Sequence, residues 1–272
     1  RGRLGPGQVG CRCGGVGRGG VTPSGWPGAV LLVAAGFGAG LSGSIAGLAS
    51  LVSYPALLAA GLSPIAANVT NTVSLIFSGI GATLGWRREL EGLWHLVFRF
   101  LPVALAGGAL GMVLLLVLPE FGFELVVPLL IGYASCQVLV KPWIERLGRR
   151  ATISVRRGRA LLLPVAVYGG YFGAGSAMLA VAVLESVVHT SLARVNALKN
   201  VLMMAANGTA AVGFALLGPV SWTAVVPLAL GYLAGGYTGP AIVRRSPAGV
   251  LRVVIGAAGL ALAGTLAART LF

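Results

Sequence analysis

Acidic residues are scarce in this sequence: six Asp and Glu stand against twenty Lys and Arg among 272 residues, and charged residues make up only 10% of the chain. An average soluble domain carries about 25% charged residues, so this chain lacks the mixed-charge surface that a soluble domain of its size needs. Hydrophobic residues reach 57% and the mean hydropathy is +0.91. The shortage of charge excludes a soluble globular domain and indicates an integral membrane protein.

The chain also lacks the residue patterns of common enzyme and metal sites. Its three cysteines offer neither a disulfide framework nor zinc spacing, and the HExxH, Walker A and G-x-S-x-G motifs are absent. Residues 38–43 match G-x-G-x-x-G, but a dinucleotide site requires a preceding soluble strand and an acidic residue about 20 positions later, and neither is present. We therefore expect no enzymatic activity, no metal site and no cofactor.

Long apolar runs fill the rest of the chain. A helix needs about 20 mostly apolar residues to cross a bilayer, and residues 28–272 have room for several such helices. Barrel strands would alternate between polar and apolar residues, whereas Leu101–Leu118 is apolar on every face. We predict an all-α integral membrane protein, a polytopic helical bundle in the cytoplasmic (inner) membrane.

The distribution of polar and glycine-rich segments divides the chain into four parts. Residues 1–27 form a Gly- and Arg-rich extension that we expect to be disordered, residues 28–140 a first membrane repeat, residues 141–159 a basic cytoplasmic loop, and residues 160–272 a second membrane repeat. Each repeat is predicted to begin with a glycine-broken hairpin of two short helices, at Gly28–Ala60 and Ala160–His189. The helices predicted after the hairpins are Pro64–Gly85, Leu93–Leu118 and Phe121–Val140, then Arg194–Leu217, Ser221–Val243 and Gly249–Ala268.

The two halves are related by a fixed offset in residue number, which we call the repeat offset. It is the difference between the numbers of Asn196 and Asn68, 196 − 68 = 128, and it also separates Trp222 from Trp94. Both residue types are infrequent in the chain. The same offset relates further matches: Pro247 to Pro119, and Gly235, Gly236 and Gly239 to Gly107, Gly108 and Gly111. The coincidence indicates an internal repeat.

Loop charges indicate how the repeats are oriented. Arg87 and Arg88 follow the first long helix of the first half, whereas in the second half basic residues follow the next helix, at Arg244 and Arg245. Because basic loops face the cytoplasm, equivalent loops would lie on opposite sides, as in an inverted repeat with three full helices and a returning hairpin in each half. The alternative is a parallel repeat in which each broken stretch crosses the membrane once, giving eight spans.

Polar residues lie at equivalent positions near the start of the helix that follows each hairpin. Such groups are costly in hydrocarbon and usually face a cavity or a partner. They could line a shared site between the halves, where a lysine and helix N-termini attract an anion. Alternatively, the asparagines join helices by hydrogen bonds and the lysine extends to the interface. The residues concerned are Asn68, Asn71 and Thr72 in the first half and Asn196, Lys199 and Asn200 in the second.

Glu185 and His189 lie four residues apart near the end of the second hairpin. This spacing predicts that they share a helical face, where they could titrate during transport and couple it to protons. The alternative is an interfacial salt bridge with Arg194.

The glycine-rich stretches identify a family resemblance. The segments Gly36–Gly47 (GFGAGLSGSIAG), Tyr168–Gly175 (YGGYFGAG), Asn196–Asn200 (NALKN) and Gly235–Gly239 (GGYTG) are similar to the TauE/SafE sulfite-exporter family of permeases, over about residues 30–272. The resemblance implies a duplicated inner-membrane protein that moves small anions, often sulfur oxyanions or organosulfonates, by secondary transport. The positions that match the family are Gly47, Gly173, Gly175, Asn196, Lys199 and Asn200.

The sequence therefore predicts a secondary transporter that works by alternating access, with a small anion and the lipid bilayer as its partners. Nucleic acid is not expected, because most of the basic residues lie in the tail and in loops, as positive-inside topology predicts. The alternative function is a non-transporting membrane scaffold or partner subunit, whose polar residues only join helices.

Overall fold

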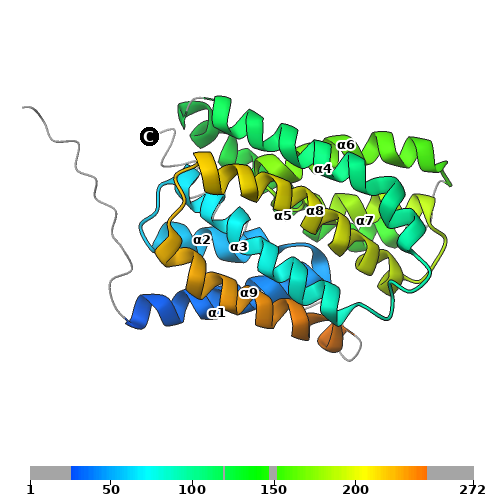
Figure 1. Ribbon diagram of the computed structural model, residues 1–272, viewed down its shortest axis with the longest axis horizontal. Helices are drawn as coiled ribbons and strands as arrows, with labels where there is room; N and C mark the ends of the chain where they lie inside the picture. The colour runs from blue at the N-terminus through cyan, green and yellow to red at the C-terminus, as the bar shows by residue number, and fades with distance from the viewer. Residues whose placement is uncertain (1–25, 119, 147–151, 244–272) are drawn as a thin grey trace, which may run out of the picture.

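The computed structural model describes residues 26–118, 120–146 and 152–243, and within these ranges the chain is entirely helical (Figure 1). Five helices, α1, α3, α4, α8 and α9, are long and apolar enough to cross a membrane. This confirms the prediction of a polytopic helical membrane protein. The helices are α1 Trp26–Ala46, α2 Ala49–Ala59, α3 Pro64–Gly85, α4 Trp94–Val117, α5 Glu120–Arg146, α6 Val155–Tyr171, α7 Ser176–Val187, α8 Leu192–Leu217 and α9 Trp222–Val243.

The helix boundaries follow the repeat offset. The helices α3 and α8 begin at Pro64 and Leu192, and α4 and α9 begin at Trp94 and Trp222. The short helices α2 and α7 correspond to within one position at both ends, and α1 and α6 correspond to within one position at their starts. The predicted counterpart of α5, Gly249–Ala268, lies outside the described residues, as does nearly all of the N-terminal extension.

Glycines set the directions of the helices by allowing close contact. In α1, Gly36 packs against Gly231 of α9 and Gly40 packs against Gly235, so the two helices run parallel. They lie side by side along the lower edge of Figure 1. The helix α3 also runs parallel to α9, because Ser78 contacts Gly236 and Gly85 contacts Pro240. Since α1 and α3 point the same way, α2 must return the chain between them, which makes α1 and α2 a hairpin.

The helices α4, α6 and α8 form the equivalent group, which runs in the opposite direction. Gly107 and Gly111 of α4 contact successive turns of α6, and Gly108 and Met112 contact successive turns of α8, so α4, α6 and α8 run parallel to one another. Against this group, α3 and α8 are antiparallel: Gly79 contacts Met204, whereas Val69 contacts Gly218.

These contacts define the directions of three pairs of equivalent helices: α1 and α6, α3 and α8, and α4 and α9. The two helices of each pair are antiparallel. This geometry favours the returning-hairpin, inverted arrangement. In the single-crossing alternative, α1 and α3 would run in opposite directions.

The hairpin breaks differ from the prediction in position. The helix α1 runs unbroken through Gly36–Gly43 and ends at Ala46, and α2 accommodates Pro55. The α1 glycines pack closely on α9 and do not interrupt the helix. Instead, the chain turns at Gly47, whose φ of +75° suits glycine. The equivalent break between α6 and α7 contains Gly173 and Gly175, with φ of +81° and +78°.

The predicted basic loop of residues 141–159 is shorter than expected. The helix α5 extends to Arg146 and α6 begins at Val155, where Ser154 caps it by accepting a hydrogen bond from the backbone N–H of Arg157. Residues with long basic side chains are good helix formers. The basic residues from which a loop was predicted can therefore also lie at the ends of helices. Residues 147–151 lie outside the described part.

Candidate functional site

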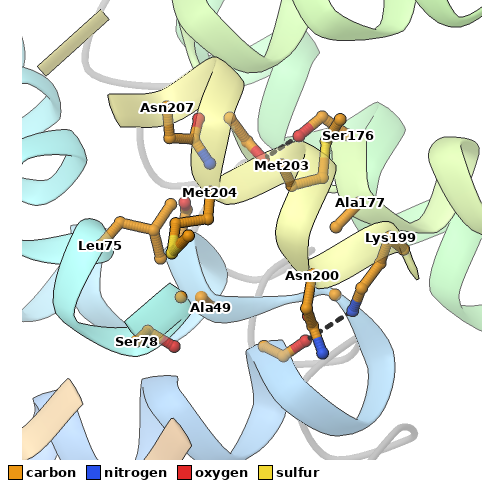
Figure 2. Close-up of a pocket in the computed structure, with 15 residues that line it drawn as sticks. Ala49, Leu75, Ser78, Ser176, Ala177, Lys199, Asn200, Met203, Met204 and Asn207 are labelled. Atoms are coloured by element: carbon orange, nitrogen blue, oxygen red, sulfur yellow. Dashed lines mark hydrogen bonds between the residues drawn. The ribbon is translucent and has the colours of Figure 1, made fainter. Parts of the chain in front are cut away.

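A polar cavity of about 50 Å³ lies where the two hairpin breaks meet α3 and α8. The breaks contribute Gly47 and Gly173, and the long helices contribute side chains from both halves. Figure 2 shows Ala49 and Ser78 on the first-half side of the cavity, facing Asn200, Met204 and Asn207 of α8. Residues of both halves therefore line the cavity.

Lys199 places a positive charge at this cavity. Its side chain is only 1% exposed, and its Nζ donates to the backbone carbonyl of Gly43 in the last turn of α1, at 3.3 Å (Figure 2). Among the described residues that line the cavity, none is acidic. A charge buried in this way is weakly screened by solvent.

Two asparagines of α8 present unused hydrogen-bonding groups beside Lys199. Nδ2 of Asn200 and Oδ1 of Asn207 are buried and have no hydrogen-bond partner among the described residues. Both side chains line the cavity and are 8% and 6% exposed. Since leaving a buried polar group unpaired costs about 1–3 kcal/mol, these amides are suited to a polar occupant.

Two helix N-termini also point their dipoles at the cavity. Ala49 and Ser50 in the first turn of α2 line it, and so do Ser176 and Ala177 in the first turn of α7. The N-terminus of a helix carries partial positive charge and exposed N–H groups, both of which favour anions. Gly175 does not line the cavity: it precedes α7 and packs against Ala134 of α5.

The predicted polar residues of α3 lie behind the cavity wall. Nδ2 of Asn68 donates to the Tyr171 carbonyl in the last turn of α6, at 2.9 Å, and the Thr72 hydroxyl donates to the Asn68 carbonyl. Asn71 bonds to three side chains of α2 and α9, described below. The contacts of Asn68 and Asn71 join helices, as the alternative interpretation expected for the asparagines, whereas that of Thr72 stays within α3.

Asn196 also lies outside the cavity lining. Its Nδ2 donates to the Leu192 carbonyl within the same turn of α8, at 3.1 Å. Of the nine predicted substrate-binding residues, the structure therefore brings four together around the cavity: Gly47, Gly173, Lys199 and Asn200.

The proposed proton-coupling pair does not share a helical face. The helix α7 ends at Val187, so Glu185 is helical whereas His189 lies in the following turn. The exposed His189 ring lies 3.1 Å from the Thr152 hydroxyl, and Arg194 donates to the Glu91 carbonyl. Neither Glu185 nor His189 lines the cavity. The prediction of a shared face was wrong because α7 ends two residues before His189.

Sequence reasoning missed several residues of the cavity wall. Asn207 lies seven positions after Asn200 and hence on the same face of α8, a spacing that could have identified it. Ser50 and Ser176 lie within three residues of Gly47 and Gly173, but hydroxyls are too common in helices to be distinguished by pattern. No group of three or more His, Cys, Asp or Glu able to hold a metal occurs in the part of the chain that the structure describes.

Comparison with known proteins finds membrane transporters of similar sequence. A probable membrane transporter protein, ORF9, from Sinorhizobium sp. is 27% identical over 239 residues, which cover 86% of this chain and 90% of that protein. A probable membrane transporter protein from Haemophilus influenzae is 25% identical over 231 residues, covering 83% and 89%. No solved structure matches the chain. The model of the family described as sulfite exporter TauE/SafE matches residues 32–266, and the chain therefore belongs to this family of membrane transporters.

Proposed function

We propose that the protein transports small anions, sulfur oxyanions or organosulfonates, across the cytoplasmic membrane by secondary transport. The observation that carries this proposal is the buried ammonium of Lys199 at a cavity whose described lining has no acidic residue. Oxyanions suit this site because their oxygens accept hydrogen bonds from an ammonium, from the Asn200 amide and from backbone N–H groups.

Alternating access follows from the placement of the cavity between the halves. The cavity is walled by α1, α2 and α3 from one half and by α7 and α8 from the other. In transporters with inverted repeats, one repeat moves against the other around such a fixed site. Movement between the halves would open the cavity first to one side and then to the other.

The charged ends of the helices indicate the orientation in the membrane. Arg87 and Arg88 follow α3, and the first turns of the oppositely directed α6 place Arg156 and Arg157 at the same end. The connections at residues 60–63 and 218–221, at the other end, are uncharged. Because basic residues face the cytoplasm, we assign the arginine-bearing end to that side.

Flux in reconstituted liposomes tests the function. The purified full chain should accumulate labelled sulfite, thiosulfate or sulfoacetate in preference to monocarboxylates. Lys199→Met and Asn200→Ala should abolish this uptake while inserting normally. Thr209→Val is the matched control, because Thr209 bonds its own turn of α8 and does not line the cavity.

Two outcomes would contradict the proposal in different ways. Normal uptake by both cavity variants would refute the assignment of the site. An absence of flux for every anion in the wild type would favour the alternative function, a scaffold or partner subunit.

Labelling of single cysteines tests the orientation. In a variant without Cys11, Cys13 and Cys136, cysteines at Gly92 and Gly218 should react from opposite sides of the membrane, with Gly92 cytoplasmic. Labelling of both positions from one side would contradict the assigned topology.

A further inference from the structure

Ser50 is a cavity residue whose hydroxyl is held in one orientation by its neighbours. It lies in the first turn of α2, is 4% exposed and lines the cavity near Gly173 of the other half. A Cβ on Gly173 would lie 3.7 Å from Ser50 Oγ, so the glycine leaves the hydroxyl uncovered. The Ser50 hydroxyl is thus accessible to an occupant of the cavity.

The orientation of this hydroxyl originates in the Asn71 carboxamide. Oδ1 of Asn71 lies 2.6 Å from the Ser53 hydroxyl and 2.8 Å from the Tyr232 hydroxyl, so it accepts hydrogen bonds on this side. With its oxygen held there, the amide nitrogen faces the other way and donates to Ser50 Oγ at 3.1 Å. Asn71, Ser53 and Tyr232 are all fully buried or nearly so, and competing water is therefore excluded.

A serine hydroxyl has one hydrogen to donate. Because Ser50 Oγ accepts from Asn71, one of its lone pairs is turned toward α3 and its hydrogen points in another direction. No described residue accepts a hydrogen bond from Ser50, so the remaining direction for this hydrogen is the cavity.

The neighbouring Ser176 has the opposite arrangement. Its hydroxyl donates to the Gly173 carbonyl at 2.8 Å, so it offers lone pairs to the cavity and no hydrogen. Of these two serines, only Ser50 can therefore donate to an anion.

We propose that Ser50 binds the substrate by donating its hydroxyl hydrogen to an oxygen of the anion, and that Asn71 and Tyr232 position it for this bond. This inference rests on the proposed anion transport. It adds a donor from the first half of the chain to the lysine and amide of α8, so that one anion contacts both halves. A ligand held in this way would couple its own binding to the relative movement of the halves.

Uptake kinetics of the full chain in liposomes test the inference, with thiosulfate as the probe. Loss of a hydrogen bond to a charged ligand weakens binding about tenfold or more, so Ser50→Ala should raise the half-saturation concentration about tenfold with little change in maximal rate. Ser74→Ala is the matched control, because this buried α3 hydroxyl bonds only its own turn and does not line the cavity. Ser50→Cys serves if Ser50→Ala fails to insert, since it keeps the shape and weakens the donor.

A double-mutant cycle separates positioning from general stability. Tyr232→Phe should raise the half-saturation concentration about threefold in the wild type and have no further effect in Ser50→Ala, because its influence passes through Ser50. Unchanged half-saturation in Ser50→Ala, or equal effects of Tyr232→Phe in both backgrounds, would overturn the inference. If the wild type itself takes up no anion, the proposed function fails first.

Discussion

The equivalent helices α3 and α8 occupy equivalent places in the fold, but their polar side chains make different contacts. Lys199 of α8 occupies the position that the repeat offset assigns to Asn71 of α3. Asn71 lies in a saturated network with α2 and α9, whereas Lys199 reaches the cavity. The two equivalent positions therefore share their place in the packing, but only the one in α8 brings its side chain to the cavity.

The two hairpins show a related exchange. The Gly43 carbonyl near the end of α1 accepts from Lys199, and the Tyr171 carbonyl at the end of α6 accepts from Asn68. Gly43 and Tyr171 are themselves equivalent positions, separated by the repeat offset. Each hairpin thus receives a side-chain donor from the long helix of the other half, which ties the halves together at the cavity.

Exchanging the two equivalent residues should have the largest effect. The double variant Asn71→Lys with Lys199→Asn retains the net charge but moves the cation into the buried network with Tyr232. Loss of a buried charged contact costs about 2–5 kcal/mol, so uptake of thiosulfate should fall about thirtyfold or more, and the melting temperature should fall as well. Recovery of uptake relative to Lys199→Asn alone would show that the two positions are interchangeable.

Substitutions of the glycines at the two hairpin breaks should differ in their effect on the stability of the protein. A side chain at positive φ costs about 1–2 kcal/mol, which applies to both Gly47→Ala and Gly175→Ala. At Gly47 the added methyl would also lie 2.8 Å from the Ala177 Cβ and 3.0 Å from the Met178 nitrogen, whereas at Gly175 its nearest neighbour is 3.1 Å away. Overpacking adds about 1–3 kcal/mol, so Gly47→Ala should lower the thermal unfolding midpoint in detergent more than Gly175→Ala. The reverse order would contradict the packing argument.

A substitution of Asn207 tests whether the cavity-lining face of α8 binds the substrate. Its equivalent in α3 is Gly79, so this amide is present in one half only. Asn207→Ala should raise the half-saturation concentration for uptake about threefold to tenfold, the loss expected for one hydrogen bond. Thr209→Val, two residues further along α8, should leave it unchanged. Equal behaviour of the two variants would remove Asn207 from the site.

Substitutions of Asn68 and Asn196 should show the smallest difference, which is a difference in stability. Hydrogen bonds between helices in membranes contribute about 0.6 kcal/mol on average and at most about 1.7. Asn68→Ala removes a bond between the halves and should lower stability by this amount, whereas Asn196→Ala removes a bond within one turn and should change stability by only a few tenths. Unfolding of both variants in mixed micelles measures the difference, and equal losses would contradict it.

Much of the fold followed from local sequence. Pro64 and Gly85 bound α3 as predicted, with Ser63 accepting a hydrogen bond from Ala66 at the N-terminus, because a cap and a proline at the first turn act within a few residues. The exact hairpin breaks were not predictable in this way. The glycines of α1 are alike in sequence, and only contact with α9 determines that Gly36 and Gly40 pack inside a helix while Gly47 forms the turn.

The residues of the site also differ in whether the sequence alone could identify them. Lys199 and Asn200 could be selected from sequence, because a cation and amides in an apolar segment require a partner or a cavity. Asn68, Asn71 and Asn196 are amides in apolar segments too, but Asn68 and Asn71 donate to groups on other helices and Asn196 donates within its own turn of α8. Ser50 carried no signal at all, since its role depends on an amide 21 residues away.

The sequence by itself determined the class of the protein. Six acidic residues, long apolar runs and a constant repeat offset specify a duplicated helical membrane protein, because hydrophobic burial in lipid and positive charge at the cytoplasmic face depend on composition and order along the chain. Only the tertiary structure decided which polar residues meet at the cavity. That choice depends on the antiparallel packing of α3 and α8, which brings groups from both halves within reach of one small cavity.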